Sequence, residues 1–172
     1  FSDEVPRQKP NCDHCDYVGL LCMQTSQSGG ESRVASAVTL HNRLLAADAE
    51  LTAVLARDFY WTRHGEVPAG KPPWDRQPVF SLHEGYFSAR GVSSYIRKAQ
   101  ELPGVPPFTA AQEAAMKLYV ETVDNCAADV AFIEGDIQFL HNHVMLHSRR
   151  AFVDWPEQMR KRHLYRLWLS DA

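Results

Sequence analysis

The sequence lacks long apolar runs and lacks an excess of charge of one sign. No stretch approaches the ~18 apolar residues that cross a bilayer, and the opening residues FSDEVPRQKP lack the basic and apolar regions of a signal peptide. Eighteen Lys and Arg against 21 Asp and Glu give a net charge of -3, so no overall basic field would attract a nucleic-acid backbone. We therefore expect a cytoplasmic protein that binds neither membrane nor nucleic acid.

Cysteine is also scarce. The four cysteines are too few and too unevenly spread for a disulfide framework, since three fall within residues 12–22 and Cys126 stands alone. We expect free thiols. A single domain of 172 residues can bury roughly 70% of its unfolded surface, so it needs neither disulfides nor metal to fold. Any metal site would therefore be functional.

Short apolar segments separated by turns dominate the chain. Alternation and turn signals predict strands or hairpins over 17–23, 31–34, 78–87, 137–140 and 164–169. Helical spacing predicts two short helices within 35–57 divided by a cap at Asp48, a helix over 109–123 with a Thr109–Gln112 capping box, and a short helix capped by Asp154. Strands without βαβ regularity favour a mainly β fold, an antiparallel sandwich or barrel with inserted helices.

The last strand carries two arginines on one face. Side chains alternate along a strand, so Arg162 and Arg166 share a face and lie roughly 13 Å apart. Both faces are otherwise largely apolar, which predicts a strand buried on both sides whose arginines meet anions inside a cavity. The alternative is a pair of rim arginines in ordinary salt bridges.

Histidine is concentrated near the end of the chain. Four of the eight histidines, His141, His143, His147 and His163, fall in the last 32 residues, and imidazole is a common neutral metal ligand. Upstream, residues 11–16 (NCDHCD) combine two thiols, two carboxylates and an imidazole. Both segments suit a metal site, although hydrogen-bonded histidines and a solvated polar loop would give the same pattern.

Three segments carry a family resemblance: CDYVGLLCMQTSQSGGESRVAS (15–36), GDIQFLHNHVMLHSRRAFVDWPE (135–157) and RKRHLYRLWLS (160–170). They resemble the TauD/TfdA-type Fe(II)/2-oxoglutarate-dependent dioxygenases over most of residues 11–172. The resemblance implies a double-stranded β-helix, or jelly roll. It also implies the cofactors Fe(II) and 2-oxoglutarate, and a reaction that couples decarboxylation of 2-oxoglutarate to hydroxylation of a small, anionic substrate.

The resemblance assigns roles to four residues. His147 matches the distal iron-ligating histidine, and Arg162 matches the arginine that pairs with the distal carboxylate of 2-oxoglutarate, assisted by Ser32. Arg166 matches a position that contacts an anionic substrate in some relatives. A guanidinium suits a carboxylate, and two histidines with one carboxylate leave iron positions open for the keto acid and dioxygen.

The iron-binding His-x-Asp motif of the family departs from its usual form here. Counted from the shared segment, it falls on Asn11-Cys12-Asp13, which keeps the carboxylate and replaces the histidine. A literal His-x-Asp occurs three residues later, at His14-Cys15-Asp16. An offset of three residues turns its side chains to the opposite face of the strand, so this motif would need a β-bulge to reach the same metal. We place Asp13 ahead of Asp16 as the ligand and keep His14 as a substitute imidazole.

The chain also begins almost at this motif, whereas family members carry a substantial preceding region. We therefore expect residues 1–172 to form a single partial jelly-roll domain. An incomplete sheet exposes hydrogen-bonding edges, which favours pairing with a second copy or a partner chain.

Two other readings remain open. A zinc-binding module would use Cys12, Cys15, His141 and His143, although one CxxC is a weak signal and the histidines are one residue apart. A non-catalytic jelly-roll binding protein would have lost its iron chemistry, and Asn11 is the residue that favours this reading.

Overall fold

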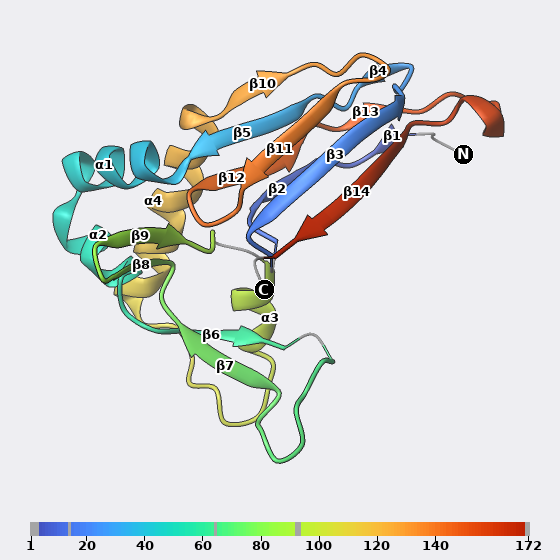
Figure 1. Ribbon diagram of the computed structural model, residues 1–172. Coiled ribbons are helices and arrows are strands. Elements are labelled where there is room, and N and C mark those ends of the chain that lie inside the picture. The colour runs from blue at the N-terminus through green and yellow to red at the C-terminus, as the bar shows by residue number, and fades with distance from the viewer. Residues whose placement is uncertain (1–3, 14, 64, 92–93, 171–172) are drawn as a thin grey trace.

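Two antiparallel sheets form a sandwich with helices and two hairpins at one end (Figure 1). The computed structural model describes residues 4–13, 15–63, 65–91 and 94–170. Its helices are α1 (Ala37–Ala47), α2 (Ala49–Leu55), α3 (Ser94–Ala99), α4 (Ala110–Cys126) and a 3-10 turn at Gln158–Arg160. Its strands are β1 (Glu4–Val5), β2 (Gln8–Asn11), β3 (Tyr17–Gln24), β4 (Ser28–Gly29), β5 (Ser32–Ser36), β6 (Phe59–Thr62), β7 (Trp74–Gln77), β8 (Phe80–His83), β9 (Tyr86–Ala89), β10 (Ala128–Val130), β11 (Ile137–His141), β12 (Met145–Arg149), β13 (Phe152–Val153) and β14 (His163–Leu169).

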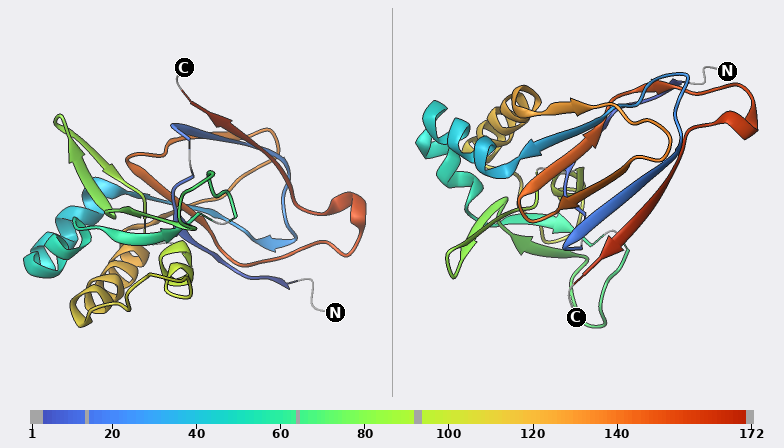
Figure 2. Two further views of the ribbon diagram at one scale, coloured as in Figure 1. Left: turned by 90° about the horizontal axis from the view of Figure 1, so that it is seen from below. Right: turned by 45° about the horizontal axis from the view of Figure 1, so that its top comes forward.

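The two larger sheets face each other. One has the order β10-β5-β12-β2 and the other the order β11-β3-β14, with every pairing antiparallel. Val18 of β3 and Leu140 of β11 pack against Val34 of β5 and Met145 of β12, so apolar contacts join the layers. Figure 2 shows the layers from two further directions. The mainly β prediction is confirmed, and the sheets do not close into a barrel.

The larger core lies at the helical end. Leu40 and Leu44 of α1, Leu55 of α2 and Tyr119 of α4 are almost fully buried there. Two of the predicted helix caps are confirmed: the Asp48 carboxylate accepts from Leu51 N at 2.8 Å, and Thr109 opens α4 with its capping box. In the described part of the chain no helix is long and apolar enough to cross a membrane.

The predicted hairpin and free thiols are also confirmed. β8 and β9 pair around a turn at Glu84 and Gly85, both with positive φ, and all four cysteines are free. Strand β12 and helix α3 were not expected from the sequence, because the His-rich stretch and the short segment after Gly91 carry no clear periodicity.

The helix predicted at Asp154 is wrong. A 3-10 turn forms only at Gln158–Arg160, and its N-cap residue makes no side-chain cap bond. The Asp154 carboxylate instead accepts from the backbone nitrogens of Trp155 at 3.1 Å and Arg162 at 2.7 Å. It therefore closes the loop that leads into β14.

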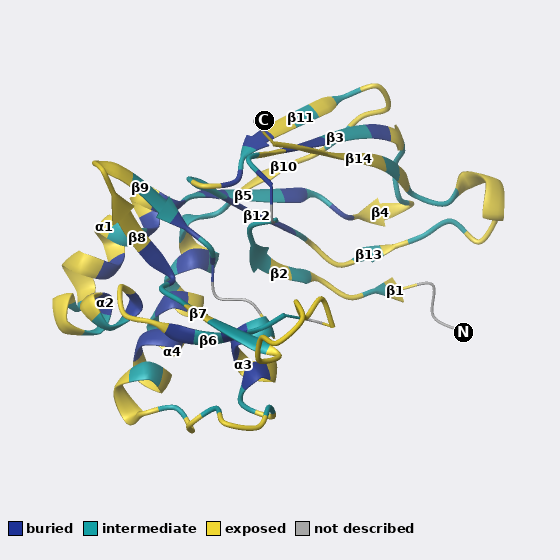
Figure 3. Ribbon diagram, turned by 60° about the horizontal axis from the view of Figure 1, so that its bottom comes forward, coloured by how far each residue is buried: buried dark blue, intermediate teal, exposed yellow. Residues whose placement is uncertain are grey.

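The expectation that the last strand is buried on both sides is also wrong. Tyr165, Leu167 and Trp168 are 53%, 58% and 63% exposed, and β14 is coloured as exposed in Figure 3. The reason is its place in the sheet: β14 is an edge strand paired only with β3 among the described residues. The predicted alternation itself holds, since Arg166 and Trp168 pair with Leu20 and Val18 on the inner face.

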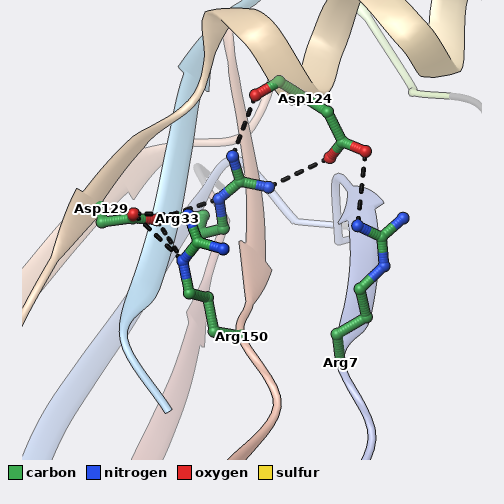
Figure 4. Close-up of polar contacts among 5 residues, drawn as sticks. All are labelled: Arg7, Arg33, Asp124, Asp129 and Arg150. Atoms are coloured by element: carbon green, nitrogen blue, oxygen red, sulfur yellow. Dashed lines mark hydrogen bonds and ion pairs between the residues drawn. The ribbon is translucent and has the colours of Figure 1, made fainter. Parts of the chain in front are cut away.

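An ionic network links Asp124 of α4 to four other segments of the chain, which carry Arg7, Arg33, Asp129 and Arg150 (Figure 4). The Arg33 guanidinium, 11% exposed, donates to the Asp124 carboxylate and carbonyl and to the Asp129 carboxylate, each at 3.0 Å. Arg7 reaches the other Asp124 oxygen at 3.3 Å, and Arg150 reaches Asp129 at 2.7 Å. Hydrogen bonds from Arg150 and then from Arg33 lower the pKa of Asp129. Its contribution to stability is therefore present at neutral pH and is lost as the pH falls below the ordinary range of a carboxyl group.

We expect Arg33→Met to lower the free energy of unfolding by about 2 kcal/mol, because Asp124 loses a charged hydrogen-bond donor in a sheltered place. Urea denaturation measures the change. The matched control is Arg97→Met, which removes an exposed pair with Glu113 and should cost less than about 1 kcal/mol. Equal losses in the two variants would contradict this role for Arg33.

Candidate functional site

The structure brings together Asp13 and His147, which are far apart in the sequence. Asp13 follows the end of β2, and His147 lies in the middle of β12, directly opposite Asn11. His147 Nε2 lies 3.6 Å from Asp13 Oδ2, and the two side chains are 5% and 9% exposed. Pairing of β2 with β12 therefore places a carboxylate and an imidazole side by side between the sheets.

The His147 ring suits a metal ligand. Both of its nitrogens are buried, and neither has a hydrogen-bond partner in the described part of the protein. Burial lowers the pKa of His147, Asp13 raises it, and Arg166 lowers it. A buried imidazole that makes no hydrogen bond costs free energy, which a bound cation at Nε2 would remove.

Two side chains of β14 also contact the Asp13 carboxylate. Trp168 Nε1 donates to Oδ2 at 3.0 Å, and Arg166 Nη1 lies 3.7 Å from the same oxygen. Asp13 is thus oriented by two side chains of β14 while it faces His147 on β12.

A polar cavity of about 310 Å³ opens beside His147 between the two sheets. We call it the arginine cavity, and its lining includes Ser32, His147, Arg149, Arg162 and Arg166. Ser32 is 4% exposed, and Arg162 Nη2 donates to Gly30 O at 3.3 Å. Burial, followed by the nearby charge of Arg149, lowers the pKa of Arg162. Three guanidinium groups in one cavity favour an anion such as a dicarboxylate.

Arg149 was not predicted from the sequence as a residue of the site. Its guanidinium lies 4.4 Å from the Phe152 ring centre and donates to Pro6 O, while Nη1 is buried with no hydrogen-bond partner in the described chain. The spacing in the sequence could have identified it. Side chains two residues apart in a strand lie on the same face, and Arg149 is two residues after His147.

Asn11 lies opposite His147, but its side chain does not take the place of the metal-ligating histidine of the family motif. Its amide nitrogen is best placed to donate to the carbonyl oxygens of Lys9 at 3.0 Å and His147 at 3.3 Å. The side chain is thus used to bind the backbone. His14, the substitute ligand expected from the sequence, lies outside the described residues.

The four residues of the zinc reading are not assembled. Cys12 Sγ donates to Ala89 O at 3.3 Å, and burial raises the pKa of this thiol to about 12, so it is not a thiolate at neutral pH. His143 lies 2.7 Å from Asp16 on an exposed surface. In the ranges that the structure describes, no three His, Cys, Asp or Glu side chains group as a metal site.

The site therefore contains part of the ligand set for iron, together with a cationic cavity suited to 2-oxoglutarate. Asp13 and His147 supply one carboxylate and one unbonded imidazole, and the arginine cavity supplies cations beside them. A third protein ligand is not among the described residues. A facial triad would need one more imidazole at this point.

Comparison with known proteins identifies the family. The sequence profile described as "Taurine catabolism dioxygenase TauD, TfdA family" matches residues 7–168. The chain belongs to the TauD/TfdA family. It is 30% identical to FR-33289 synthase of Streptomyces rubellomurinus. The aligned 166 residues cover 92% of this chain and 48% of that protein.

Solved structures of iron oxygenases show the same fold. An asparagine oxygenase in complex with Fe(II), 2S,3S-3-hydroxyasparagine and succinate matches with a TM-score of 0.70 and 20% identity, over 98% of this chain and 50% of that chain. The non-heme iron oxygenase OrfP, with Fe and alpha-ketoglutaric acid, matches with a TM-score of 0.65 and 18% identity, over 91% of this chain and 45% of that chain. The jelly-roll prediction is confirmed, and Fe(II) and 2-oxoglutarate are the cofactors that these relatives indicate.

This chain spans about half the length of the relatives and structures that it matches. The comparisons therefore establish the family and the fold.

We expect His147→Ala to abolish Mn(II) binding, because this imidazole alone of the three nearby histidines faces Asp13. His141→Ala and His143→Ala should weaken binding by about a hundredfold at most, since His141 packs on Tyr17 and His143 pairs with Asp16. Electron paramagnetic resonance of free Mn(II) measures the three affinities. Loss of binding in His141→Ala or His143→Ala, with binding intact in His147→Ala, would show that a different strand supplies the ligand.

Proposed function

We propose that residues 1–172 form a single partial jelly-roll domain of an Fe(II)/2-oxoglutarate-dependent oxygenase that hydroxylates a small, anionic substrate. The observation that carries the proposal is the Asp13–His147 pair at the arginine cavity. A carboxylate and a buried, unbonded imidazole 3.6 Å apart suit Fe(II), and the adjoining guanidinium groups suit the carboxylates of 2-oxoglutarate.

Each residue of the site has a distinct part in the proposal. Asp13 and His147 hold the metal, and Trp168 and Arg166 orient the Asp13 carboxylate through the contacts at Oδ2. Arg162 binds the distal carboxylate of 2-oxoglutarate, and the buried Ser32 hydroxyl assists it. Arg166 lines the arginine cavity and lies 3.7 Å from Asp13, so its guanidinium can contact an anionic substrate beside the metal. His14 is retained as a candidate for the missing imidazole.

The bound metal and keto acid would supply the oxidation: dioxygen and 2-oxoglutarate are converted to succinate and carbon dioxide while one oxygen atom enters a C–H bond of the substrate. The protein's part is to fix the reactants in position. Arg162 and Ser32 set the orientation of 2-oxoglutarate, and the surrounding sheets exclude water from the buried Asp13 and His147 side chains.

A second candidate is a non-catalytic jelly-roll binding protein. The observation in its favour is that only two metal ligands, Asp13 and His147, meet in the described part of the chain, while the Asn11 amide is directed to backbone oxygens. Such a protein would retain the arginine cavity and bind a small dicarboxylate without iron.

The open edge of β14 supports the further expectation that a second copy or another chain pairs with this sheet.

The cytoplasmic location expected from composition stays a prediction.

Anaerobic titration with Fe(II) and 2-oxoglutarate tests the proposed function. A keto acid bound to iron through two oxygens gives a weak visible absorption band, and we expect that band here. Binding of 2-oxoglutarate without Fe(II), and without the band, would instead support the non-catalytic reading.

We expect Arg162→Ala to weaken 2-oxoglutarate binding by about tenfold to a hundredfold, because a charge-assisted hydrogen-bond donor is lost while Arg149 and Arg166 remain. Calorimetry in the presence of Mn(II) measures the affinity. The matched control is Arg160→Ala, two residues earlier, where an exposed guanidinium packs on Trp155 and pairs with Glu157. Unchanged affinity in Arg162→Ala would remove this residue from the keto-acid site.

We expect Asn11→His to tighten Mn(II) binding, because position 11 lies opposite His147 and the variant would add the second imidazole of a facial triad. The control is His14→Ala in the native background. If Asn11→His has no effect and His14→Ala destroys binding, the later His-x-Asp sequence supplies the ligand and the family alignment fails locally.

A further inference from the structure

A second cavity lies on the other side of Asp13. Its volume is about 450 Å³, and we call it the aromatic cavity because Trp61 and Trp168 line it together with Lys9, Asp13, Arg90 and Arg166. Asp13 faces this cavity, His147 faces the arginine cavity, and Arg166 lines both. The proposed metal pair therefore stands where the two cavities meet.

The charges that line the aromatic cavity are mostly positive. Lys9, Arg90 and Arg166 are cations, and Asp13 is the one acidic side chain among the described lining residues. Asp13 is already held by Arg166 and Trp168. This balance favours an anionic ligand and disfavours an amine.

Arg90 is the cation that the fold holds in place. Its guanidinium lies 5.2 Å from the centre of the Trp61 ring and donates to the Gln77 side chain. The Trp61 indole is fixed in turn, since Nε1 donates to Gln77 O at 2.9 Å. Burial lowers the pKa of Arg90, and the charge of Asp75 acts in the opposite direction. An arginine oriented beforehand loses less side-chain entropy when it binds an oxyanion.

Two tryptophans supply the remaining chemistry. Trp61 is 5% exposed, on β6, while Trp168 is on the inner face of β14. Their rings present apolar surface at the same cavity as the guanidinium groups. A ligand with an oxyanion head and an apolar body would satisfy both kinds of lining.

We propose that the aromatic cavity is the site of the primary substrate, and that this substrate is a small organic acid whose oxyanion is bound by Arg90 and whose apolar body packs on Trp61. The inference rests on the proposed function in one respect, that the substrate lies next to the metal held by Asp13 and His147. Arg90 and Trp61 are thereby specificity residues, supplied by segments that lie outside the jelly-roll strands.

Calorimetry with four probes of one shape tests this inference: phenylphosphonate, benzenesulfonate, benzoate and benzylamine. Each is titrated into the protein with and without saturating Mn(II) and 2-oxoglutarate, so that the arginine cavity is filled in one arm. The three acids should bind and the amine should not, and the order among the acids identifies the head group. Equal binding of benzylamine and the acids would overturn the proposal.

Arg90→Gln should weaken binding of the best acid by about tenfold to a hundredfold and leave Mn(II) and 2-oxoglutarate affinity unchanged. The matched control is Arg76→Gln, because Arg76 also lies over a β6 ring, 5.7 Å from the centre of Tyr60, yet is exposed and outside the cavity. Arg90→Lys retains the charge and should restore part of the affinity, which keeps the test decisive if Arg90→Gln unfolds.

The outcomes also separate the two proposals. Acids that bind through Arg90 in a protein that takes up neither Mn(II) nor 2-oxoglutarate would refute the oxygenase and leave the cavity assignment standing. Mn(II) and 2-oxoglutarate binding, combined with acid binding that is unchanged in Arg90→Gln, would refute the cavity assignment alone.

Discussion

The arrangement of the site depends on one pairing, that of β12 between β5 and β2. Antiparallel pairing sets His147 opposite Val34 on one side and Asn11 on the other. Because side chains alternate along a strand, this register sends His147 and Arg149 in the same direction, while Asp13 follows directly from the end of β2. A slip of one residue would turn His147 away from Asp13, so the chemistry of the site is fixed by backbone hydrogen bonds.

The second requirement is that the opposite sheet supply the other half of the site. β14 pairs with β3 so that Arg166 and Trp168 point inward, and both contact Asp13. The carboxylate is therefore shared by two sheets, and it separates one cavity rich in arginine from another that combines arginine and tryptophan. This division allows a keto acid and a second small molecule to approach the same pair of side chains from different sides.

Local signals in the sequence predicted the elements with strong caps or clear alternation. The Thr109 capping box, the Asp48 cap, the hairpin at Glu84-Gly85 and the face shared by Arg162 and Arg166 depend on neighbours in the chain, and sequence alone displays these. The Asp154 helix failed because a carboxylate that could cap a helix instead bonds to Arg162 N, eight residues away. Burial of β14 failed because composition cannot distinguish a central strand from an edge strand. Within the site, family resemblance led to Asp13 and His147, whereas Arg90 and Trp61 belong to segments with no motif and come together only through tertiary packing.

The edge position of β14 has a consequence for motion. A strand hydrogen-bonded on one side and exposed on much of its surface opens locally at lower free energy than a strand held on both sides. Arg166 lies within β14 and Arg162 directly before it, so each opening of this strand withdraws guanidinium groups from the arginine cavity. Backbone amides of Leu167 and Leu169 should therefore exchange hydrogen faster than those of Val18 and Leu20, and the residence time of a bound anion is tied to how often the last strand detaches.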